Sequence, residues 1–401
     1  MTTNSLPHHI ADAINQLGQD RSDGPLCCYL FDLEALRNRI RQMSEALPSN
    51  VALFYAAKAN PMPEILATLA PYVAGFEAAS GGELAHLAQQ DHHKPLIFGG
   101  PGKLESELKT ALELGIDAIH VESLTELKHL IRLAKALDCQ APIFLRMNID
   151  IGSITLSKLA MGGRPTPFGL DSDELEHAIA LIQQNPCLQL KGFHFHLMSH
   201  QLEVDKHLAL MKCYFDAVKA WQAQYQLPPL AINLGGGMGI NYTQPDQHFD
   251  WLNFCERLTQ LIQQEGMADT PLRFECGRFI SAPCGYYVTE IIDLKRNLGE
   301  YFAVCRGGTH HFRTPAAQSH NHPFVIIDGN IQDFSEEKIT DELVTLVGQL
   351  CTPKDVFSRA QSIAELKIGD YVVFTLAGAY SWNISHQNFL MHPAPKFHYL
   401  N

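Results

Sequence analysis

The stretch Phe54-Tyr-Ala-Ala-Lys-Ala-Asn-Pro61 determines how the rest of the chain is interpreted. Residues 51–57 are small or apolar, a pattern that predicts a buried strand. Lys58 stands at the carboxyl end of that strand, and the Asn60-Pro61 pair after it favours a turn. A lysine among apolar neighbours loses hydration, which disfavours its ammonium form and makes it a nucleophile able to form a Schiff base. The alternative is a lysine that opens a solvated loop.

Short apolar strands and helical patterns alternate outward from this stretch. The expected strands are 51–57, 73–77, 95–98, 118–121, 143–147, 188–196, 230–234 and 272–275, and the clearest helices are 33–47, 105–114, 124–136, 173–184, 202–222 and 251–265. Eight strands, each followed by a helix-length segment, predict a (β/α)8 barrel. An open doubly wound sheet is the alternative, but the glycine-rich turn that would follow its first strand is missing.

The pattern changes after about residue 280, where β-branched and aromatic residues dominate. Strands are expected at 286–294, 301–305, 324–328, 343–351 and 370–376, which together indicate an antiparallel β domain, a barrel in our interpretation. The strand at 25–32 precedes the barrel series and is expected to join this domain. The predicted chain is therefore of the α/β class, with a (β/α)8 domain at 34–280 and a β-barrel domain made of 1–33 and 281–401.

Composition excludes several classes of protein. A net charge of −13 over 401 residues argues against nucleic-acid binding, although it leaves room for a local basic pocket that takes an anionic ligand. No apolar run is long enough to span a membrane, and the N-terminal residues lack a secretion signal, so we expect a cytoplasmic protein without membrane contact. The ten cysteines are scattered without a Cys-x-x-Cys pair, which favours free thiols.

Candidate reacting groups follow the expected strands, because active sites of such barrels lie at the carboxyl ends of the strands. These groups are Lys58 after the first strand, Glu77 and Ser80 after the second, His194 and His196 on the sixth, Gly235-Gly236-Gly237 after the seventh, and Glu275 to Arg278 after the eighth. A glycine run alone also suits a tight turn without a ligand. Its position after the seventh strand favours phosphate binding by bare backbone amides.

His194 and His196 are two residues apart on a strand and so face the same side. Such a pair can hold zinc, can place one ring flat on an aromatic cofactor, or can include one histidine that is simply buried and hydrogen-bonded. Stacking is favoured, because the other strand ends carry Lys58, glycines and Glu275 rather than further zinc ligands, and no metal is predicted. The histidines at 92–93, 310–311 and 320–322 are expected in solvated loops.

A desolvated lysine, an anion-binding loop, a stacking imidazole and a carboxylate together meet the needs of pyridoxal 5'-phosphate. Lys58 would hold the aldehyde of this cofactor, and His196 would cover one face of its ring. The amides of Gly235, Gly236 and Gly237, together with Arg278, would bind the phosphate. Glu275 would pair with the pyridine nitrogen and keep it protonated.

These residues stand in motifs that resemble the alanine-racemase-like (fold type III) pyridoxal-phosphate enzymes, specifically the ornithine/diaminopimelate/arginine decarboxylase family. The similar motifs are Tyr55-Ala-Ala-Lys-Ala-Asn60, Ser80-Gly-Gly-Glu-Leu84, Phe168-Gly-Leu170, His194-Phe-His-Leu-Met-Ser199, Gly235-Gly-Gly237, Glu275-Cys-Gly-Arg278, Cys351-Thr-Pro-Lys-Asp355 and Gly378-Ala-Tyr380. The resemblance runs from about Tyr29 to His398 and implies a carboxy-lyase. It also implies that Ser199, Gly277 and Tyr380 contact the cofactor.

The resemblance further implies a homodimer with active sites at its interface. Cys351 would be the acid that protonates the carbanion left by carbon dioxide, and it would come from the partner subunit. Asp355 and Tyr380 would come from the same side, with Asp355 among the substrate contacts. Without the resemblance, Cys351 would be interpreted as a thiol buried at a strand end.

Departures from the family pattern bear on the substrate, which is expected to be a small-molecule amino acid with a polar tail. Thr352 stands where the family usually has an acidic residue for the distal ammonium of the substrate, and an unpaired buried ammonium is costly. Arg164, in the segment 161–170, and Arg313 favour carboxylates instead. The chain is similar to the branch that decarboxylates amino-acid conjugates in carboxylate siderophore assembly, and diaminopimelate decarboxylase is the alternative.

Three other functions are considered. An amino-acid racemase uses a similar barrel but needs a tyrosine base opposite the lysine, whereas Cys351 and the long β domain favour decarboxylation. A zinc hydrolase would be colourless and would contain metal. A homologue that has lost catalysis and only binds a partner is disfavoured, because the residues expected in the site are all retained: Lys58, Glu275, Arg278, Cys351 and Tyr380.

Overall fold

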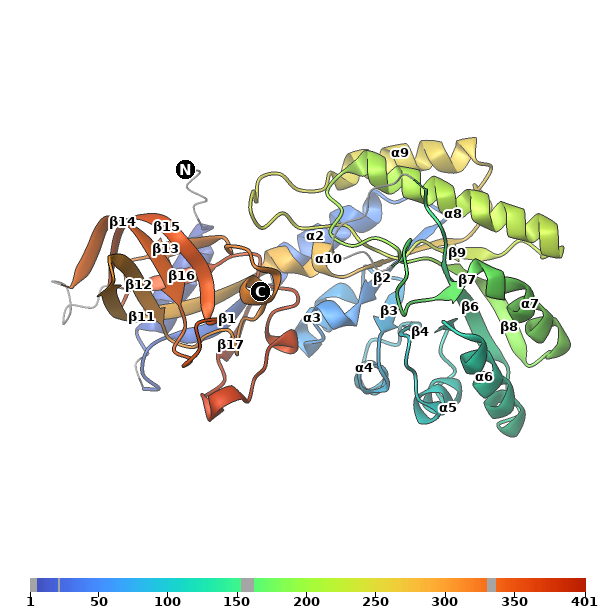
Figure 1. Ribbon diagram of the computed structural model, residues 1–401, viewed down its shortest axis with the longest axis horizontal. Helices are drawn as coiled ribbons and strands as arrows, with labels where there is room; N and C mark the ends of the chain where they lie inside the picture. The colour runs from blue at the N-terminus through green and yellow to red at the C-terminus, as the bar shows by residue number, and fades with distance from the viewer. Residues whose placement is uncertain (1–5, 21, 153–161, 330–336) are drawn as a thin grey trace. The chain divides into compact units, whose positions relative to one another are not determined.

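The computed structural model describes residues 6–20, 22–152, 162–329 and 337–401. The chain divides into two compact units (Figure 1). The barrel unit comprises residues 37–240 and 248–280, and the β unit comprises residues 1–36, 241–247 and 281–401. The predicted strand-rich region after residue 280 thus lies in the β unit, and Lys58 lies in the barrel unit.

The barrel unit contains a closed ring of parallel strands. In order around the ring they are β2 (Val51–Ala56), β3 (Gly75–Ala78), β4 (Leu96–Phe98), β5 (Ala118–Val121), β6 (Ala141–Asn148), β8 (Leu188–His194), β9 (Ala231–Asn233) and β10 (Leu272–Cys276). The last strand, β10, pairs in parallel with β2 and closes the ring. A two-residue strand, β7 (Leu170–Asp171), adds to the edge of β6. All eight expected strands are present, so the predicted (β/α)8 barrel is confirmed.

Helices alternate with these strands and lie around them in Figure 1. They are α2 (Leu33–Glu45), α3 (Pro63–Leu69), α4 (Gly81–Ala88), α5 (Glu105–Glu113), α6 (Leu124–Ala136), α7 (Leu175–Gln184), α8 (Val204–Tyr225), α9 (Trp251–Gln264) and α10 (Arg278–Ser281). Two of them start with a serine cap: Ser80 accepts a hydrogen bond from Glu83 N at the start of α4, and Ser123 accepts one from Glu126 N at the start of α6. Each cap satisfies an amide that the first helical turn leaves unpaired.

The strands of the β unit form one mixed sheet. They are β1 (Cys27–Asp32), β11 (Gly285–Asn297), β12 (Glu300–Cys305), β13 (Phe324–Ile327), β14 (Lys338–Val347), β15 (Val356–Lys367), β16 (Tyr371–Phe374) and β17 (Lys396–Leu400). The order is β13-β16-β11-β12-β14-β15, with β1 joined to β11 and β17. Most pairs are antiparallel, whereas β1 with β17 and β12 with β14 are parallel. The N-terminal strand joins this sheet as expected, but β15 and β17 were not anticipated.

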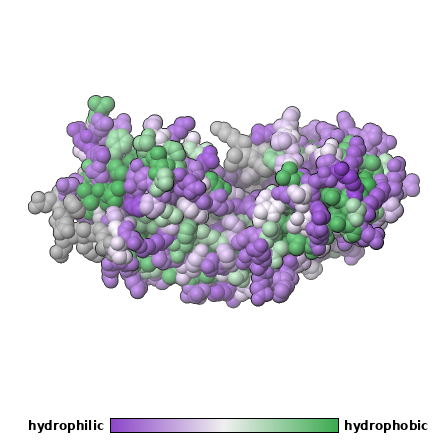
Figure 2. Space-filling view, turned by 90° about the horizontal axis from the view of Figure 1, so that it is seen from below, coloured by the Kyte–Doolittle hydropathy of each residue, from purple (hydrophilic) through white to green (hydrophobic). Residues whose placement is uncertain are grey.

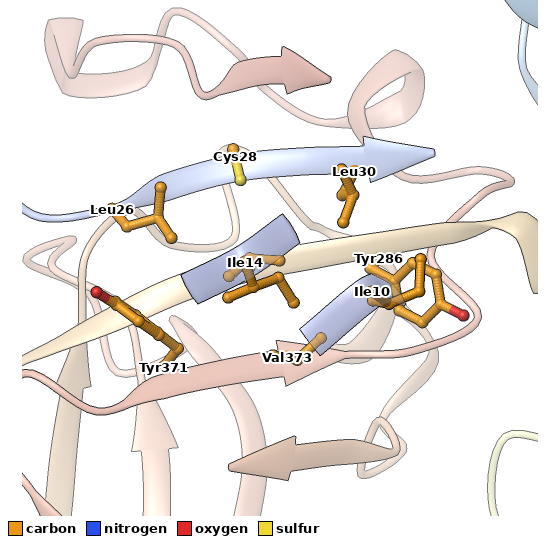
Figure 3. Close-up of a cluster of buried hydrophobic side chains, with 9 residues drawn as sticks. Ile10, Ile14, Leu26, Cys28, Leu30, Tyr286, Tyr371 and Val373 are labelled. Carbon is orange, nitrogen blue, oxygen red and sulfur yellow. The ribbon is translucent and has the colours of Figure 1, made fainter. Parts of the chain in front are cut away.

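The first helix, α1 (His8–Gly18), was also not anticipated, and it covers the core of the β unit (Figure 3). Ile10 and Ile14 are fully buried and lie one helical turn apart, so they present one apolar face. That face packs on side chains from three strands, Cys28 and Leu30 of β1, Tyr286 of β11, and Tyr371 and Val373 of β16. Burial of this helix face therefore holds the N-terminal segment on the β unit.

The surface and the cysteines agree with the expectations from composition. On the face shown in Figure 2, hydrophilic residues dominate, and hydrophobic residues are scattered among them in small groups. Among the described residues, no helix is both long enough and apolar enough to cross a membrane. All ten cysteines are free thiols, and Cys351 is the exposed one.

Candidate active site at the carboxyl ends of the barrel strands

Lys58 lies in a single 3-10 turn, Ala57–Ala59, directly after β2. Its Nζ donates hydrogen bonds to both carboxylate oxygens of Glu77, at 3.0 and 3.1 Å. Glu77 is buried at the end of β3, whereas about a third of the Lys58 side chain (35%) is exposed. Burial raises the pKa of the Glu77 carboxyl, and the nearby Lys58 ammonium opposes that rise. The amine of Lys58 is thus held in place by a carboxylate and is still open to an incoming group.

Glu275, at the end of β10, is the centre of a second buried polar cluster. Asn233 of β9 donates a hydrogen bond from Nδ2 to Glu275 Oε1 at 2.7 Å. His120 Nδ1 lies 3.5 Å from the same oxygen, and His194 Nε2 lies 3.3 Å from Oε2. The two imidazole rings stack, with 4.0 Å between their centroids. Asn233 therefore holds the carboxylate by a hydrogen bond, and the two imidazole rings lie against it.

Burial disfavours the charged form of both histidines of this cluster. Burial lowers the pKa of His120 and of His194 well below the ordinary value, and neighbouring cationic groups lower it further. The Nδ1 atoms of both rings have no hydrogen-bond partner among the described residues. Within that same part of the chain, the ligand atoms of His120, His194 and Glu275 lie within 4.8 Å of one another, a spacing that a metal ion could use. The sequence analysis considered zinc only for the pair His194 and His196 and did not predict this cluster.

His196 and the glycine run are joined by a hydrogen bond that orients the ring. The Gly236 amide donates to His196 Nδ1 at 3.0 Å, and the Gly235 amide donates to Asn233 Oδ1 at 3.0 Å. These two predicted phosphate ligands therefore donate within the protein. The Gly237 amide has no acceptor among the described residues. A side chain at Gly236 would lie 2.1 Å from the Glu275 carbonyl oxygen, so only glycine lets this loop pass so close to β10.

Arg146 and Glu122 form a buried ion pair beside this site, and sequence reasoning missed it. Arg146 Nη1 lies 2.7 Å from Glu122 Oε1, and both side chains are less than a tenth exposed. Glu122 also accepts hydrogen bonds from the amides of Gly100 and Gly169. The available signal was an arginine inside the apolar pattern 143–147 and a glutamate directly after the strand 118–121.

The remaining predicted residues of the barrel unit lie at the same strand ends. Ser199 is half-buried after β8, and Arg278 is half-buried at the first position of α10, directly after Gly277. Arg164 has an exposed side chain, and its carbonyl oxygen accepts a hydrogen bond from Asn148 Nδ2 at the end of β6. The residues 153–161 of the neighbouring segment lie outside the described part of the chain.

The other predicted site residues belong to the β unit. Cys351 is exposed in the loop after β14, which ends at Val347 rather than at residue 351. Asp355 closes this loop, because its buried carboxylate accepts hydrogen bonds from the amides of Thr309 and Leu350, at 2.6 and 2.8 Å. Burial raises the pKa of Asp355. Tyr380 is half-buried, with a backbone φ of 50°, a left-handed conformation that is uncommon outside glycine.

The expectation of solvated histidine loops is wrong for three residues. His310 and His311 are fully buried, and His322 is 2% exposed. His311 Nε2 lies 2.9 Å from the Pro393 carbonyl oxygen, and His322 Nε2 lies 2.7 Å from the Thr375 carbonyl oxygen. Segments distant in sequence cover these loops, which a local pattern cannot reveal.

The barrel site fits pyridoxal phosphate. Glu275 is a buried carboxylate held by Asn233 and is suited to a protonated pyridine nitrogen. Lys58 is held by Glu77 at a neighbouring strand end, and the Gly236 contact sets the plane of His196. The Gly237 amide lies in a loop whose glycine at φ 103° lets the backbone approach an anion. These features define a (β/α)8 enzyme of the pyridoxal-phosphate class.

Comparison with known proteins identifies the family. A family model described as "Pyridoxal-dependent decarboxylase, pyridoxal binding domain" matches residues 33–282. The chain belongs to this family and is a pyridoxal-phosphate-dependent decarboxylase.

Two curated relatives illustrate the range of similarity. The "2-[(L-alanin-3-ylcarbamoyl)methyl]-2-hydroxybutanedioate decarboxylase" of Staphylococcus aureus is 45% identical over 378 residues, which are 94% of this chain and 94% of that protein. A diaminopimelate decarboxylase of Bacteroides thetaiotaomicron is 28% identical over 357 residues, which are 88% of this chain and 90% of that protein.

A solved structure agrees with the fold. Diaminopimelate decarboxylase of Helicobacter pylori, complexed with L-lysine, aligns with a TM-score of 0.84 at 24% identity and covers 97% of this chain and 94% of that one. At this identity the match supports the architecture alone.

Proposed function

We propose that this decarboxylase acts on an amino acid joined to a carboxylate-rich tail, in the assembly of a carboxylate siderophore. The observation that carries the proposal is the 45% identity, along nearly the whole chain, to the Staphylococcus aureus decarboxylase. The name of that enzyme's substrate describes an alanine unit linked through a carbamoyl group to 2-hydroxybutanedioate, a dicarboxylate. Diaminopimelate decarboxylase activity is the alternative, and relatives with that activity are less similar, at 28% identity or close to it.

The proposed roles of the barrel residues follow from their contacts. Bound pyridoxal phosphate supplies an electron sink for the electron pair left when carbon dioxide departs. Lys58 attaches the cofactor, and Glu77 holds its Nζ in position. His196 covers one ring face and leaves the other to the substrate. Glu275, fixed by Asn233, keeps a proton on the pyridine nitrogen.

Anion binding and proton return complete the site. We assign the cofactor phosphate to the Gly237 amide, to Arg278, and to the hydroxyl groups of Ser199 and Tyr380. Gly235, Gly236 and Gly277 let the backbone come close to that phosphate. Cys351 Sγ donates a proton to the α-carbon of the substrate after carbon dioxide has left. Asp355 was expected among the substrate contacts, but its buried carboxylate accepts hydrogen bonds from two backbone amides, so we assign it to holding the Cys351 loop.

The proposed active enzyme is a homodimer, in which residues 34–280 of one subunit bind the cofactor. Residues 1–33 and 281–401 form the second domain, which supplies Cys351 and Tyr380 of the partner subunit. Arg164 and Arg313 bind carboxylates of the substrate. The ten free thiols suit the reducing cytoplasm.

Subunit mixing tests whether two chains share a site. Lys58→Ala and Cys351→Ala are each expected to be nearly inactive. Mixed in equal amounts with subunit exchange, half of the dimers are hybrids with one intact site, so about a quarter of wild-type activity returns. Activity that stays at the level of the separate variants would place Lys58 and Cys351 of one site in the same chain.

A substrate panel tests the reaction itself. Mass spectrometry with the cofactor-loaded enzyme would follow loss of one carbon dioxide from meso-diaminopimelate, lysine, ornithine, arginine and a citryl-diaminopropionate conjugate. We expect turnover of the conjugate. Turnover of diaminopimelate in its place would assign the enzyme to lysine synthesis.

A further inference from the structure

The β unit contains a cavity of about 850 Å³ with a largely apolar lining, whose charged side chains are all cationic. It lies between α11 (Thr314–Gln318), the loop that follows Cys351, and the first residues of β15. Three cationic side chains line it: Arg313, Lys354 and Arg359. No acidic residue is among the residues that line the cavity, although the chain as a whole carries 43 acidic and 30 basic residues.

These three cations are exposed and are not neutralised by a neighbouring carboxylate of the described residues. Within the described part of the chain, no carboxylate oxygen lies within 4.0 Å of the side-chain nitrogens of Arg313, Lys354 or Arg359, whereas Lys338 of the same unit pairs with Glu365 at 3.1 Å. Unpaired like charges around one cavity repel one another, and a multiply charged anion converts that repulsion into attraction. The charge pattern points to a ligand with more than one carboxylate.

Neutral groups of the cavity add hydrogen-bonding capacity and a fixed frame. Ser319 and Thr352 bring hydroxyl groups to the walls, whereas the Thr309 side chain is bonded to Asp355. The Asn321 side chain accepts a hydrogen bond from Arg359 N and donates one to Arg359 O, at 2.9 and 3.1 Å, which fixes the start of the Arg359 side chain. An arginine guanidinium can bind a carboxylate through two parallel hydrogen bonds.

The cavity is connected to the reaction through a single loop. Thr352 lines the cavity and directly follows Cys351, the proposed proton donor. The loop is held by Asp355 and by a hydrogen bond from Thr352 N to the Leu350 carbonyl oxygen at 2.8 Å. A ligand seated in the cavity is therefore held within a residue or two of the thiol.

We infer that this cavity binds the polycarboxylate tail of the substrate, and that Lys354 and Arg359, together with Arg313, select for it. The inference rests on the proposed function and deepens it. A substrate whose far end carries an ammonium would meet three cations and no carboxylate here, so the same walls disfavour diamine precursors. Free citrate carries the same chemistry and is expected to bind the cavity as well.

The test measures KM, kcat and citrate binding in the cofactor-loaded enzyme. Lys354→Gln and Arg359→Gln are each expected to raise KM for the citryl-diaminopropionate conjugate about tenfold, equal to about 1.4 kcal/mol, with kcat nearly unchanged. Calorimetry should show citrate affinity falling by a similar factor. The matched controls are Lys338→Gln and Arg296→Gln, which remove the same charges from side chains of this unit that do not line the cavity. Cofactor absorbance verifies that the site is intact.

Hydrogen exchange gives a readout that does not depend on turnover. Citrate is expected to slow exchange in residues 314–320 and 352–359 of the wild-type enzyme and to have little effect there in Lys354→Gln. Unchanged KM and citrate affinity in both variants, or equal losses in the controls, would overturn the cavity assignment while leaving the decarboxylase function intact. A wild-type enzyme that does not decarboxylate the conjugate but binds citrate in the cavity would overturn the proposed function. The assignment of the cavity as a polycarboxylate site would then stand.

Discussion

The strand ends of the barrel and the cavity of the β unit both carry cationic side chains. These cations are paired with carboxylates at the strand ends and, within the described part of the chain, are unpaired around the cavity. At the strand ends, Lys58 is paired with Glu77 and Arg146 with Glu122. Around the cavity, Arg313, Lys354 and Arg359 have no carboxylate partner among the described residues. The first arrangement is preorganised, since its geometry is set by the protein itself. The second is completed by an anion from outside. In our proposal the cofactor site lies among paired charges, and the tail of the substrate is bound by unpaired ones.

The largest expected effect is the loss of turnover in Lys58→Ala. Removing Nζ takes away both the attachment point of the cofactor and the partner of Glu77, so decarboxylation should fall by at least about 10³-fold. Steady-state assays and the absorbance of bound cofactor measure this loss. Lys338→Ala, which removes an exposed lysine of the β unit, should keep wild-type rates. Appreciable turnover by Lys58→Ala would contradict its assigned role.

Breaking the buried Arg146–Glu122 pair should be the next largest effect. Arg146→Met leaves the Glu122 carboxylate buried without its cation, which we expect to lower the free energy of unfolding by about 3–5 kcal/mol. Denaturant unfolding would measure it. The exposed Lys338–Glu365 pair is the contrast, and Lys338→Gln should cost about 1 kcal/mol or less. Similar losses of unfolding free energy in the two variants would show that the buried pair is no more important for stability than the exposed one.

His207 should make the stability of the barrel unit depend on pH. Burial of this residue, between Phe249 and Phe254, lowers its pKa to about 4. The unfolded chain binds a proton at a higher pH, about 6.5, so the contribution is complete above that value and is lost as the pH falls toward 4.

The variant His207→Leu removes this titration. Between pH 7 and pH 5, the unfolding free energy of the wild type should fall by about 2 kcal/mol more than that of His207→Leu. Other buried histidines titrate in both proteins, so the difference isolates His207. Parallel pH profiles for the two proteins would show that His207 is not held neutral.

The smallest effect concerns Ser80, a strand-end residue that the structure explains as a helix cap. Ser80→Ala should lower stability by about 1 kcal/mol, because Glu83 N loses its acceptor, and should leave kcat unchanged. Ser123→Ala, at the equivalent cap of α6, should behave alike. A fall in kcat for Ser80→Ala alone would give Ser80 a part in the chemistry.

Local patterns in the sequence predicted the barrel and the residues that follow each strand. Strand length, apolar runs and the position of Lys58 are all local properties. The rule that barrel sites lie at the carboxyl ends of strands then selected the candidate site residues. The contacts between these side chains could not be predicted from local patterns. The contacts of Lys58 with Glu77 and of His120 with Glu275 depend on which strands become neighbours. Ser80 was predicted as a candidate reacting group because it follows a strand. In the structure it caps the helix α4, since the residues after a barrel strand also begin the next helix.

The β unit was harder to predict for related reasons. Its strand β17 pairs in parallel with β1, which lies at the other end of the chain. No local pattern in the sequence therefore predicts this pairing. The residues of strand β15 do not alternate regularly between buried and exposed positions. The unpaired cations of the cavity are brought together from two separate segments, around Arg313 and around Lys354 and Arg359. Sequence reasoning found the first of these by resemblance and missed the second.

A competition assay tests the central claim most directly. The cofactor-loaded wild-type enzyme would receive equal concentrations of the citryl-diaminopropionate conjugate and meso-diaminopimelate in one reaction, and mass spectrometry would follow both products. The ratio of the two initial rates gives the ratio of kcat/KM values directly. We predict that the conjugate is preferred by a factor of about 100 or more. Equal rates, or a preference for diaminopimelate, would contradict the account of an enzyme that selects a carboxylate-rich tail.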